Sequence, residues 1–368
     1  MPEIRNELLY QIAITQLRDV GPVSVKRLIA HCGSASAVFC EKKKLLERIP
    51  GIHKNMVTSI LQNGVLEVAE REIQFIEKNQ ITPCFYLSPE YPSRLKHCAD
   101  GPIMLYFRGN ADLNHPRIIG VVGTRQPSRY GLEQCAALMA ELATVDVLVV
   151  SGLAYGIDAC AHKEALEAGL KTVGVLAHGL DRIYPPVHRY LARKMLLDGG
   201  LLTDYISGTN PDRQNFPSRN RIVAGISDAV IVIESGIKGG ALITADIANS
   251  YNRDVFAIPG RNTDPPSAGC NLAISENRAG ILLGGNHLVS VMGWDEKKSR
   301  SQRQQEIFIN LSAEEERIVN IIRQMGEPLV DQISLECSIP VSRTASLLLE
   351  LELKGVIRCL PGKKYSLG

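Results

Sequence analysis

The stretch IIGVVGTRQPSRYG, residues 118–131, decides the fold. It opens with a run that is apolar except for Gly120, as a strand covered on both faces of a parallel sheet must be. The run ends in a turn at Gly123, and a helix is expected to begin after it. A strand, a turn and a helix in this order predict one repeat of an α/β domain.

The same pattern recurs along the middle of the chain. Short apolar, β-branched runs alternate with helical segments, which is typical of a parallel sheet with crossover helices. We therefore predict an α/β fold with a doubly wound, Rossmann-like parallel sheet, whose ligands lie at the carboxyl ends of the strands. The predicted core spans residues 117–285, with strands at 118–123, 147–151, 172–177, 201–206, 229–234 and 255–259.

The flanking segments predict the rest of the domain organisation. With an irregular N-terminal extension that holds one or two strands, the Rossmann-like domain covers residues 81–294. Residues 1–80 repeat apolar side chains at helical spacing and predict a helical domain. Residues 295–309 begin with DEKKSRSQRQQE, which predicts a linker. Residues 310–368 form a further domain.

Two segments of the helical domain, DVGPVSVKRLI and RIPGIHKNMVTSI, resemble helix-hairpin-helix elements. The turn amides of such elements bind a DNA phosphate. Both segments lack the second glycine of the pattern and carry Val23 and His53 there. Non-specific DNA contact and a plain helical interaction domain both remain open.

The C-terminal domain shows three amphipathic helical segments followed by VIRCLPGKKYSL, which suits two short strands. This order predicts a winged helix-turn-helix. Residues 340–368 hold five Lys or Arg and two Glu, which is only weakly basic. A DNA-binding role and a protein-interaction role are both left open.

Charge and cysteine content bound the function classes. Over 368 residues, 41 Lys and Arg against 39 Asp and Glu give a net charge of +2, so a polyanionic partner needs a local basic face. The nine cysteines form no C-x-x-C pair, which suits free thiols in a reducing cytosol. No apolar run is long enough for a membrane span, and we expect a cytoplasmic protein without membrane association.

The first two strand ends suggest an anion site. No dinucleotide or Mg-nucleotide fingerprint is intact, so no cofactor is expected. Thr124 and Arg125 instead place a hydroxyl and a guanidinium before a helix, which makes a good anion seat, although Arg125 could also be a surface ion pair. The turn SGLAYGID after the second strand lets amides near Gly152 approach a ligand. Its Asp158 has only His162 one helical turn away, so no metal site is expected.

The sharpest local charge bias lies in RQNFPSRNRIVAGIS, which contains Arg213, Arg219 and Arg221 and no acid. An aromatic ring among cations suits a single-stranded nucleic acid, because the cations bind phosphates and Phe216 stacks on a base. The alternative is that Phe216 belongs to the core and the arginines form a solvated face.

Two further strand ends add cations to the predicted crevice. Arg182 follows the third strand, and Lys238, Gly239 and Gly240 form a glycine-rich loop before a helix after the fifth. With these two cations and Arg261 after the sixth strand, nearly every strand end carries a basic residue. The distribution favours a basic crevice over coincidence.

Five motifs in this order resemble the DNA-processing protein A (DprA, or Smf) family: GVVGTRQPSRYG, VSGLAYGIDACAH, GLDRIYPP, NFPSRNRIVAGIS and GGALITADIA. Together with EYPSRL and LYFRG, the resemblance spans about residues 90–285. It implies a cytoplasmic, non-enzymatic protein that binds single-stranded DNA during natural transformation, protects it and helps to load a RecA-type recombinase. It also implies a homodimer formed through the Rossmann-like domain.

The resemblance assigns DNA contacts residue by residue. The family's Gly-Ser-Arg turn corresponds to Gly123, Thr124 and Arg125, a change that keeps the hydroxyl. Tyr155 stands where the family usually carries a cation, so one phosphate contact is lost or replaced by stacking. The family's aromatic and basic segment and its glycine-rich loop correspond to Arg213, Phe216, Pro217, Arg219, Asn220, Arg221, Lys238, Gly239 and Gly240.

Two other functions stand beside this one. The sheet and its glycine-rich loop also resemble, more distantly, nucleoside monophosphate phosphoribohydrolases of the lysine-decarboxylase-like fold, in which Glu234 would be the acid. A transcription regulator acting through the winged domain alone would leave the basic crevice unused.

Overall fold

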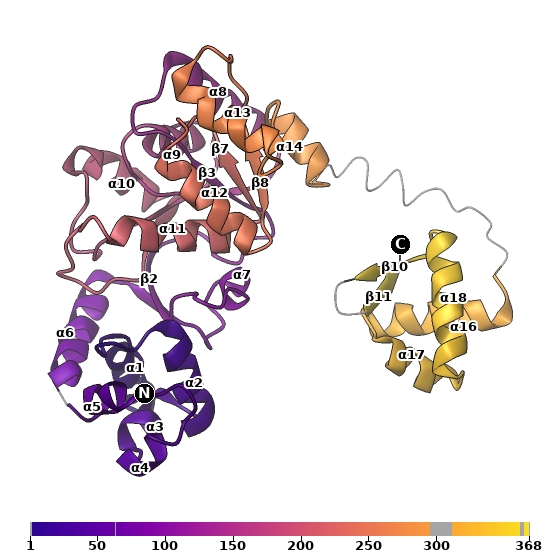
Figure 1. The fold of residues 1–368 in the computed structure, drawn as a ribbon, viewed down its shortest axis with the longest axis horizontal. Helices are drawn as coiled ribbons and strands as arrows, with labels where there is room; N and C mark the ends of the chain where they lie inside the picture. Colours follow the sequence, from indigo (N-terminus) through magenta and orange to yellow (C-terminus); the bar gives the residue numbers. More distant parts are fainter. Residues whose placement is uncertain (1, 63, 295–310, 361–363, 368) are drawn as a thin grey trace. The chain divides into compact units, whose positions relative to one another are not determined.

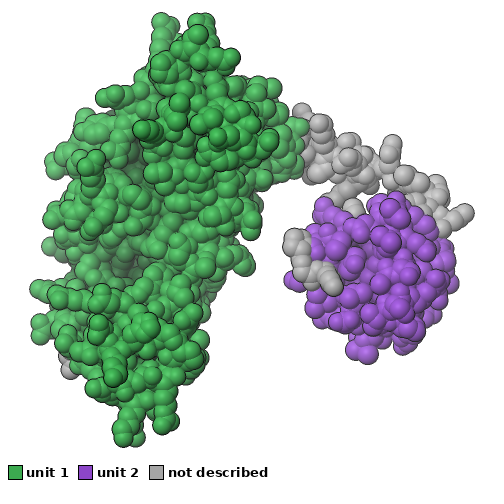
Figure 2. Space-filling model, in the orientation of Figure 1, with its two compact units in different colours: residues 1–294 green, residues 295–368 purple. Residues whose placement is uncertain are grey.

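A computed structural model describes residues 2–62, 64–294, 311–360 and 364–367. The chain divides into two compact units, residues 1–294 and 295–368, which Figure 2 shows in different colours. No helix in the described part of the chain is both long and apolar enough to cross a membrane.

A nine-stranded sheet forms the centre of the larger unit, in the order β1-β2-β6-β5-β4-β3-β7-β8-β9 (Figure 1). In this spatial order, all neighbouring strands from β6 through β5, β4, β3, β7 and β8 to β9 pair in parallel. The strands β1 and β2 are antiparallel additions at one edge. The strand bounds are β1 Thr82–Phe85, β2 Met104–Gly109, β3 Ile118–Val122, β4 Leu148–Ser151, β5 Thr172–Val175, β6 Gly199–Thr203, β7 Ala229–Val232, β8 Asp254–Ala257 and β9 Gly280–Ile281.

The predicted α/β fold is confirmed, and all six predicted strands are present. The largest difference is at β6, which occupies Gly199–Thr203 and not 201–206. Gly199 and Gly200 pair with β5, but as glycines they do not extend the apolar pattern by which the strand was predicted. The extension holds β1 and β2, as expected. The strand β9 was not predicted, since its two residues are too few to show a periodicity.

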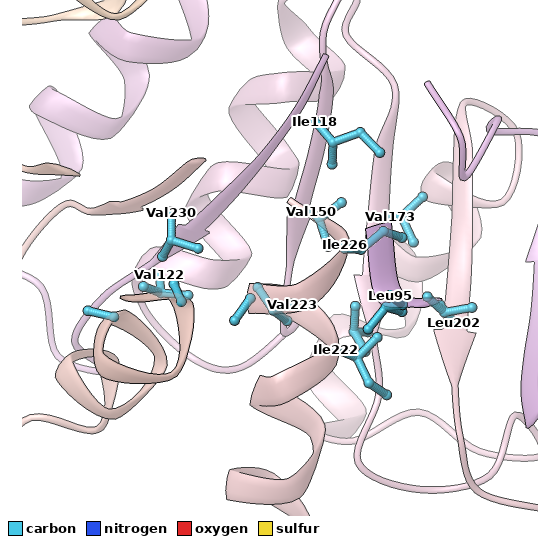
Figure 3. Close-up of a cluster of buried hydrophobic side chains, with 14 of the residues drawn as sticks. Leu95, Ile118, Val122, Val150, Val173, Leu202, Ile222, Val223, Ile226 and Val230 are labelled. Atoms are coloured by element: carbon cyan, nitrogen blue, oxygen red, sulfur yellow. The ribbon is translucent and has the colours of Figure 1, made fainter. Parts of the chain in front are cut away.

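Helices cover both faces of the sheet, and strand side chains alternate between the two layers. Val122, Val150 and Val230 point into one layer (Figure 3), whereas Ile119 and Val149 point into the other. The first layer is covered by α7 Ser93–Lys96, α11 Asn215–Ile226, α12 Gly240–Ser250 and α13 Ala268–Ser275, which follows the 3₁₀ turn η2 Pro265–Ser267. The second is covered by α8 Arg129–Leu142, α9 Ile157–Glu167, α10 Arg189–Met195, which follows the 3₁₀ turn η1 Pro186–His188, and α14 Gly285–Val291.

The strand order reverses at β3. This strand lies between β4 and β7, so the chain winds to one side after β3 and returns to its other side with β7. In open α/β sheets a crevice forms at such a switch point, outside the carboxyl ends of the strands. The expected ligand site is therefore at the end of β3.

The N-terminal helices pack against the antiparallel edge of the sheet. Their core includes Phe85 of β1 and Met104 and Tyr106 of β2, which joins them to the α/β layers in one unit. Glu72 of α6 is buried and accepts hydrogen bonds from the backbone amide and hydroxyl of Ser207. These helices are α1 Pro2–Thr15, α2 Pro22–Cys32, α3 Ala35–Cys40, α4 Lys43–Leu46, α5 Lys54–Leu61 and α6 Gly64–Asn79.

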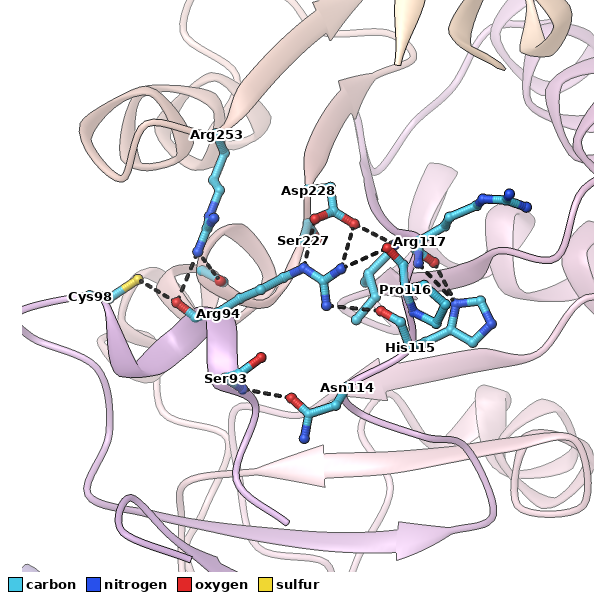
Figure 4. Close-up of polar contacts among 12 residues, drawn as sticks. Ser93, Arg94, Cys98, Asn114, His115, Pro116, Arg117, Ser227, Asp228 and Arg253 are labelled. Carbon is cyan, nitrogen blue, oxygen red and sulfur yellow. Dashed lines mark hydrogen bonds and ion pairs between the residues drawn. The ribbon is translucent and has the colours of Figure 1, made fainter. Parts of the chain in front are cut away.

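An arginine fastens the extension to the sheet (Figure 4). The guanidinium of Arg94 donates to both carboxylate oxygens of Asp228, at 2.6 and 2.9 Å, and to the carbonyls of His115 and Pro116. Asp228 directly precedes β7, and its Oδ2 also accepts the amide of Ile118 at the start of β3. One ion pair thus joins the extension to the two central strands.

The smaller unit is a winged helix, as predicted. Three helices and a two-stranded antiparallel hairpin enclose a separate core that includes Ile318, Ile322, Leu347 and Leu351. The elements are α16 Ala313–Met325, α17 Val330–Cys337, α18 Val341–Leu353, β10 Ile357–Leu360 and β11 Lys364–Leu367. The predicted linker at 295–309 lies outside the described residues.

Candidate functional site

The loop after β3 is held by neighbouring elements so that Arg125 projects outward. The amide of Thr124 donates to the Glu234 carbonyl at 2.8 Å, and its own carbonyl accepts the Ile157 amide at 3.1 Å. A Cβ at position 123 would lie 2.5 Å from Ile157, so the turn requires Gly123. The Arg125 side chain is exposed.

Phe216 lies beside this arginine, in the first turn of α11. The Cζ atom of Arg125 is 5.3 Å from the centroid of the Phe216 ring, within the range of a cation–π contact. The Tyr184 ring lies 6.1 Å away, at an interplanar angle of 58°. Phe216 is half-buried and belongs to none of the hydrophobic clusters of the described residues. Phe216 therefore lies at the strand ends and not in the hydrophobic core, where the alternative interpretation of the sequence placed it.

These side chains border a crevice of about 610 Å³ at the switch point. Arg125 and Arg213 supply cations to it, and the start of α12 opens onto it. In the described part of the chain, Asp158 is the one acid among the lining residues, and it is 8% exposed. The lining comprises Val122, Gly123, Thr124, Arg125, Ala154, Asp158, Tyr184, Pro211, Arg213, Phe216, Pro217, Arg219, Asn220, Ser235, Gly239, Gly240, Ala241, Ile243 and Thr244.

The start of α12 offers backbone donors to the crevice. Gly239 is the N-cap residue, and no side chain caps this helix. A Cβ at Gly239 would lie 2.1 Å from the Ser235 hydroxyl, whereas one at Gly240 would meet no atom within 4 Å. Unpaired amides at a helix N-terminus attract anions. The exposed Lys238 precedes them and is not among the residues that line the crevice.

Arg219 lies deeper than the sequence suggested. It is 4% exposed, and its Nη1 donates to the carbonyls of Gly152 and Val175, which follow β4 and end β5. A Cβ at Gly152 would lie 2.2 Å from this nitrogen, so the glycine makes room for the arginine. Burial raises the pKa of Asp158, and the charge of Arg219 opposes that rise. Arg219 therefore holds the strand ends together beneath the crevice.

Two other predicted cations are engaged by protein groups. Arg221 pairs with Asp204 at 2.9 Å and donates to the Asp100 carbonyl at 2.7 Å. Arg182 pairs with Asp181 at 2.8 Å and donates to Asn210. Neither arginine lines the crevice, because each is drawn to a neighbouring acid.

Tyr155 lies in the turn after β4 and is 48% exposed. Its ring meets that of His188 edge-on, with centroids 5.4 Å apart. It also borders a small pocket next to the crevice, together with Arg125, Tyr184 and Phe216. An aromatic surface thus occupies the position where the resembling family usually carries a cation.

The hydrolase alternative is not favoured by the placement of Glu234. This side chain is 1% exposed and accepts hydrogen bonds from the amide and the hydroxyl of Ser128, at 2.7 and 2.5 Å. It positions the start of α8 and does not line the crevice. A glycosidic bond in the crevice would therefore not meet this carboxylate.

The Asp158 and His162 pair also has a structural role. Burial lowers the pKa of His162 to about 3, and its Nδ1 lies 2.6 Å from the Thr172 hydroxyl. The described residues contain no group of three or more metal-ligating side chains. Among the described residues, no third metal-ligating side chain joins Asp158 and His162.

Tyr184 is the residue that sequence reasoning missed. It is 44% exposed and lines both the crevice and the adjoining small pocket. Its motif, GLDRIYPP, carries an aromatic residue soon after a strand end, and this was the available signal.

The fold and the crevice define a class first: Rossmann-like proteins that have a crevice with basic side chains at the switch point of a doubly wound sheet. Comparison with known sequences narrows the class. The model of the DNA recombination-mediator protein A family matches residues 82–293, and that of the DprA winged helix domain matches residues 309–363. This chain belongs to the DNA recombination-mediator protein A family.

Individual relatives agree with this assignment. Protein Smf of Synechocystis is 36% identical over 78% of this chain and 73% of its own length, and the DNA processing protein DprA of Streptococcus pneumoniae is 40% identical over 53% and 68%. The crystal structure of the pneumococcal protein has a TM-score of 0.65 and 30% identity over 77% of this chain and 97% of its own. A structure of DNA processing protein A from Helicobacter pylori, reported for its single-stranded DNA binding mode, has a TM-score of 0.54 and 27% identity. The match covers 59% of this chain and 97% of that chain.

Proposed function

We propose that this protein binds single-stranded DNA in the crevice at the end of β3. The observation that carries the proposal is the Phe216 ring, held between Arg125 and Tyr184 at the crevice. An exposed aromatic face stacks on an unpaired base, while neighbouring cations bind phosphates. Arg125, Arg213 and the amides at the start of α12 are the proposed phosphate contacts, with Asn220 lining the same crevice.

The preference for single strands follows from the same contacts. A base must leave its duplex to stack on Phe216, and that costs the energy of pairing and stacking. The Helicobacter pylori relative, whose single-stranded DNA binding mode is described, supports this choice of ligand.

We expect an oligonucleotide to bind at least about fivefold more tightly as a single strand than as a duplex of the same sequence and salt, because base stacking contributes about 1–3 kcal/mol. Fluorescence anisotropy titrations on the full chain, with both forms labelled alike, measure the ratio. Equal affinities for the two forms would contradict the preference for single strands. Failure to bind either form would refute the proposed function.

The proposed role is to receive single-stranded DNA in natural transformation, protect it and help to load a RecA-type recombinase. The family's description as a recombination mediator supports this role. We place the protein in the cytoplasm, where its nine free cysteines suit a reducing compartment. We also propose a binding protein and not an enzyme, because the crevice combines a stacking surface with cations and Glu234 is engaged elsewhere.

We propose a homodimer formed through the open edge of the sheet. The N-terminal helices pack on β1 and β2 at one side of the sheet, whereas Ile281 of β9 and the nearby Leu283 are 46% and 71% exposed at the other edge. An uncovered edge with apolar side chains favours pairing with a second copy, and two-fold symmetry is the commonest closed arrangement. A dimer would also hold long DNA more tightly than short DNA, since two crevices can bind one strand.

Light scattering at micromolar concentration is expected to give the mass of a dimer for the wild type and of a monomer for Leu283→Glu. The buried charge would disrupt an edge-to-edge contact. Leu87→Glu is the matched control, because Leu87 is also exposed, at 60%, and lies far from β9 in the strand order. A monomeric wild type would refute the dimer and leave the crevice chemistry untouched.

For the winged helix we propose a protein-interaction role. The exposed side of α18 carries Ser346, Leu349, Glu350 and Leu353, with Leu353 81% exposed. Arg343, the basic residue of this helix, pairs with Glu314 at 2.8 Å. On the helix that would enter a DNA groove, the acidic side chain repels phosphates and the apolar side chains offer them no contact, so this face suits a protein surface better.

A further inference from the structure

We propose that single-stranded DNA continues from the crevice across Tyr155 and His188 onto the exposed face of α10, where Tyr190 provides a second stacking surface. The inference rests on the proposed function and extends it, because it assigns a second binding segment on the same domain. The ligand is the next stretch of the same strand.

Two contacting aromatic pairs, Tyr184 with Phe216 and Tyr155 with His188, lead out of the crevice. Tyr184 and Phe216 line both the crevice and the small pocket, and Tyr155 also lines that pocket. Tyr155 then meets His188 at 5.4 Å, just before α10 begins. Half-exposed rings thus follow one another without an intervening acid in this pocket.

The outer face of α10 combines the same residue types. Tyr190 is 69% exposed, and the Lys194 ammonium lies 4.9 Å from its ring centroid. Arg189 and Arg193 are exposed one turn apart, and in the described part of the chain no side-chain hydrogen bond or ion pair engages either guanidinium. A large aromatic side chain left in water among unpaired cations is what a single-strand path requires.

The neighbouring groove limits the course of the strand. His188, Tyr190 and Lys194 form one rim of a groove of about 960 Å³ between α8, α9 and α10. Glu133 of α8, Glu167 of α9 and Asp198, which follows α10, also line this groove. These carboxylates would repel phosphates, so the backbone is expected to follow the outer face of α10, with bases turned toward Tyr190.

The binding test compares a short oligonucleotide of about 6 nucleotides, which fills the crevice, with one of about 20, which reaches α10. Tyr190→Ala should weaken binding of the long strand about 5- to 100-fold and leave the short strand unchanged. Tyr190→Phe should bind both like the wild type. Arg189→Ala with Arg193→Ala should also weaken only the long strand and reduce its salt dependence.

Lys171→Ala is the charge control. Lys171 is exposed and directly precedes β5, so it lies at the opposite end of the sheet from the crevice. Its loss should change neither oligonucleotide's affinity. Light scattering on each variant checks that the oligomeric state is the same, since a second copy also favours long strands.

Long-strand affinity unchanged in Tyr190→Ala and in the double arginine variant would overturn the inference. The proposed function fails in a different way, because the wild type would then bind neither the short nor the long strand. Since Tyr190, Arg189 and Arg193 are exposed, unfolding curves should match the wild type.

Discussion

Replacing Arg219 with alanine is expected to lower the free energy of unfolding by about 3–5 kcal/mol, because it leaves buried acceptors unsatisfied and removes a buried charge that offsets a carboxylate. The side chain donates to the carbonyls of Gly152 and Val175 and offsets the charge of the buried Asp158. Its loss leaves two carbonyl acceptors without their donor and removes the positive charge that offsets the buried carboxylate. Urea unfolding followed by circular dichroism measures the change.

Arg213→Ala is the control for this variant. Arg213 lies just before the same helix but is exposed and lines the crevice, so its loss should leave the unfolding free energy within about 0.5 kcal/mol of the wild type. It should instead weaken DNA binding. If Arg219→Ala unfolds like the wild type and loses only DNA affinity, then Arg219 contacts phosphate directly and the structural role is refuted.

Replacing Phe216 with alanine is expected to cost about 1–3 kcal/mol of single-stranded DNA affinity, the typical contribution of one stacked base. The dependence on salt should hardly change, because no charge is removed. Arg125→Ala should behave differently and lower the slope of log affinity against log salt by about 0.7, the contribution of one phosphate on a single strand. Titrations at several salt concentrations separate the two mechanisms.

Phe216→Tyr keeps the aromatic face and serves as the matched control, with an affinity close to the wild type. Since Phe216 is half-buried beside Arg125 and Tyr184, the alanine variant should remain folded. Extensive unfolding of Phe216→Ala would show that the ring supports the core. Equal loss of salt slope in both variants would contradict the division into stacking and charge.

The sheet could be predicted because its signal is local. Runs such as Ile118–Val122 are apolar enough to require burial on both faces, and the turns between strands and helices follow in the sequence. The same logic located the crevice, since parallel strands bring Gly123, Phe216 and Gly239 to one edge.

The roles of the individual arginines could not be predicted, because their partners are distant in the chain. Arg219 binds carbonyls 67 and 44 residues away, and Arg221 binds Asp204, which is 17 residues away. A cluster of cations in the sequence indicates that positive charge is present. Only the tertiary contacts decide which guanidinium is hydrogen-bonded to protein groups and which, like that of Arg213, faces solvent.

The ion pair between Arg94 and Asp228 sets the smallest piece of this chain that can fold alone. Judged by strands and crossover helices, the α/β domain begins at about residue 117, but a fragment cut there would leave Asp228 without its guanidinium and β6 without its neighbour β2. The segment that can fold alone is therefore the longer one, which includes the extension. For protein engineering, a transplantable α/β module has to start before Arg94, and this limit follows from one electrostatic contact across 134 residues.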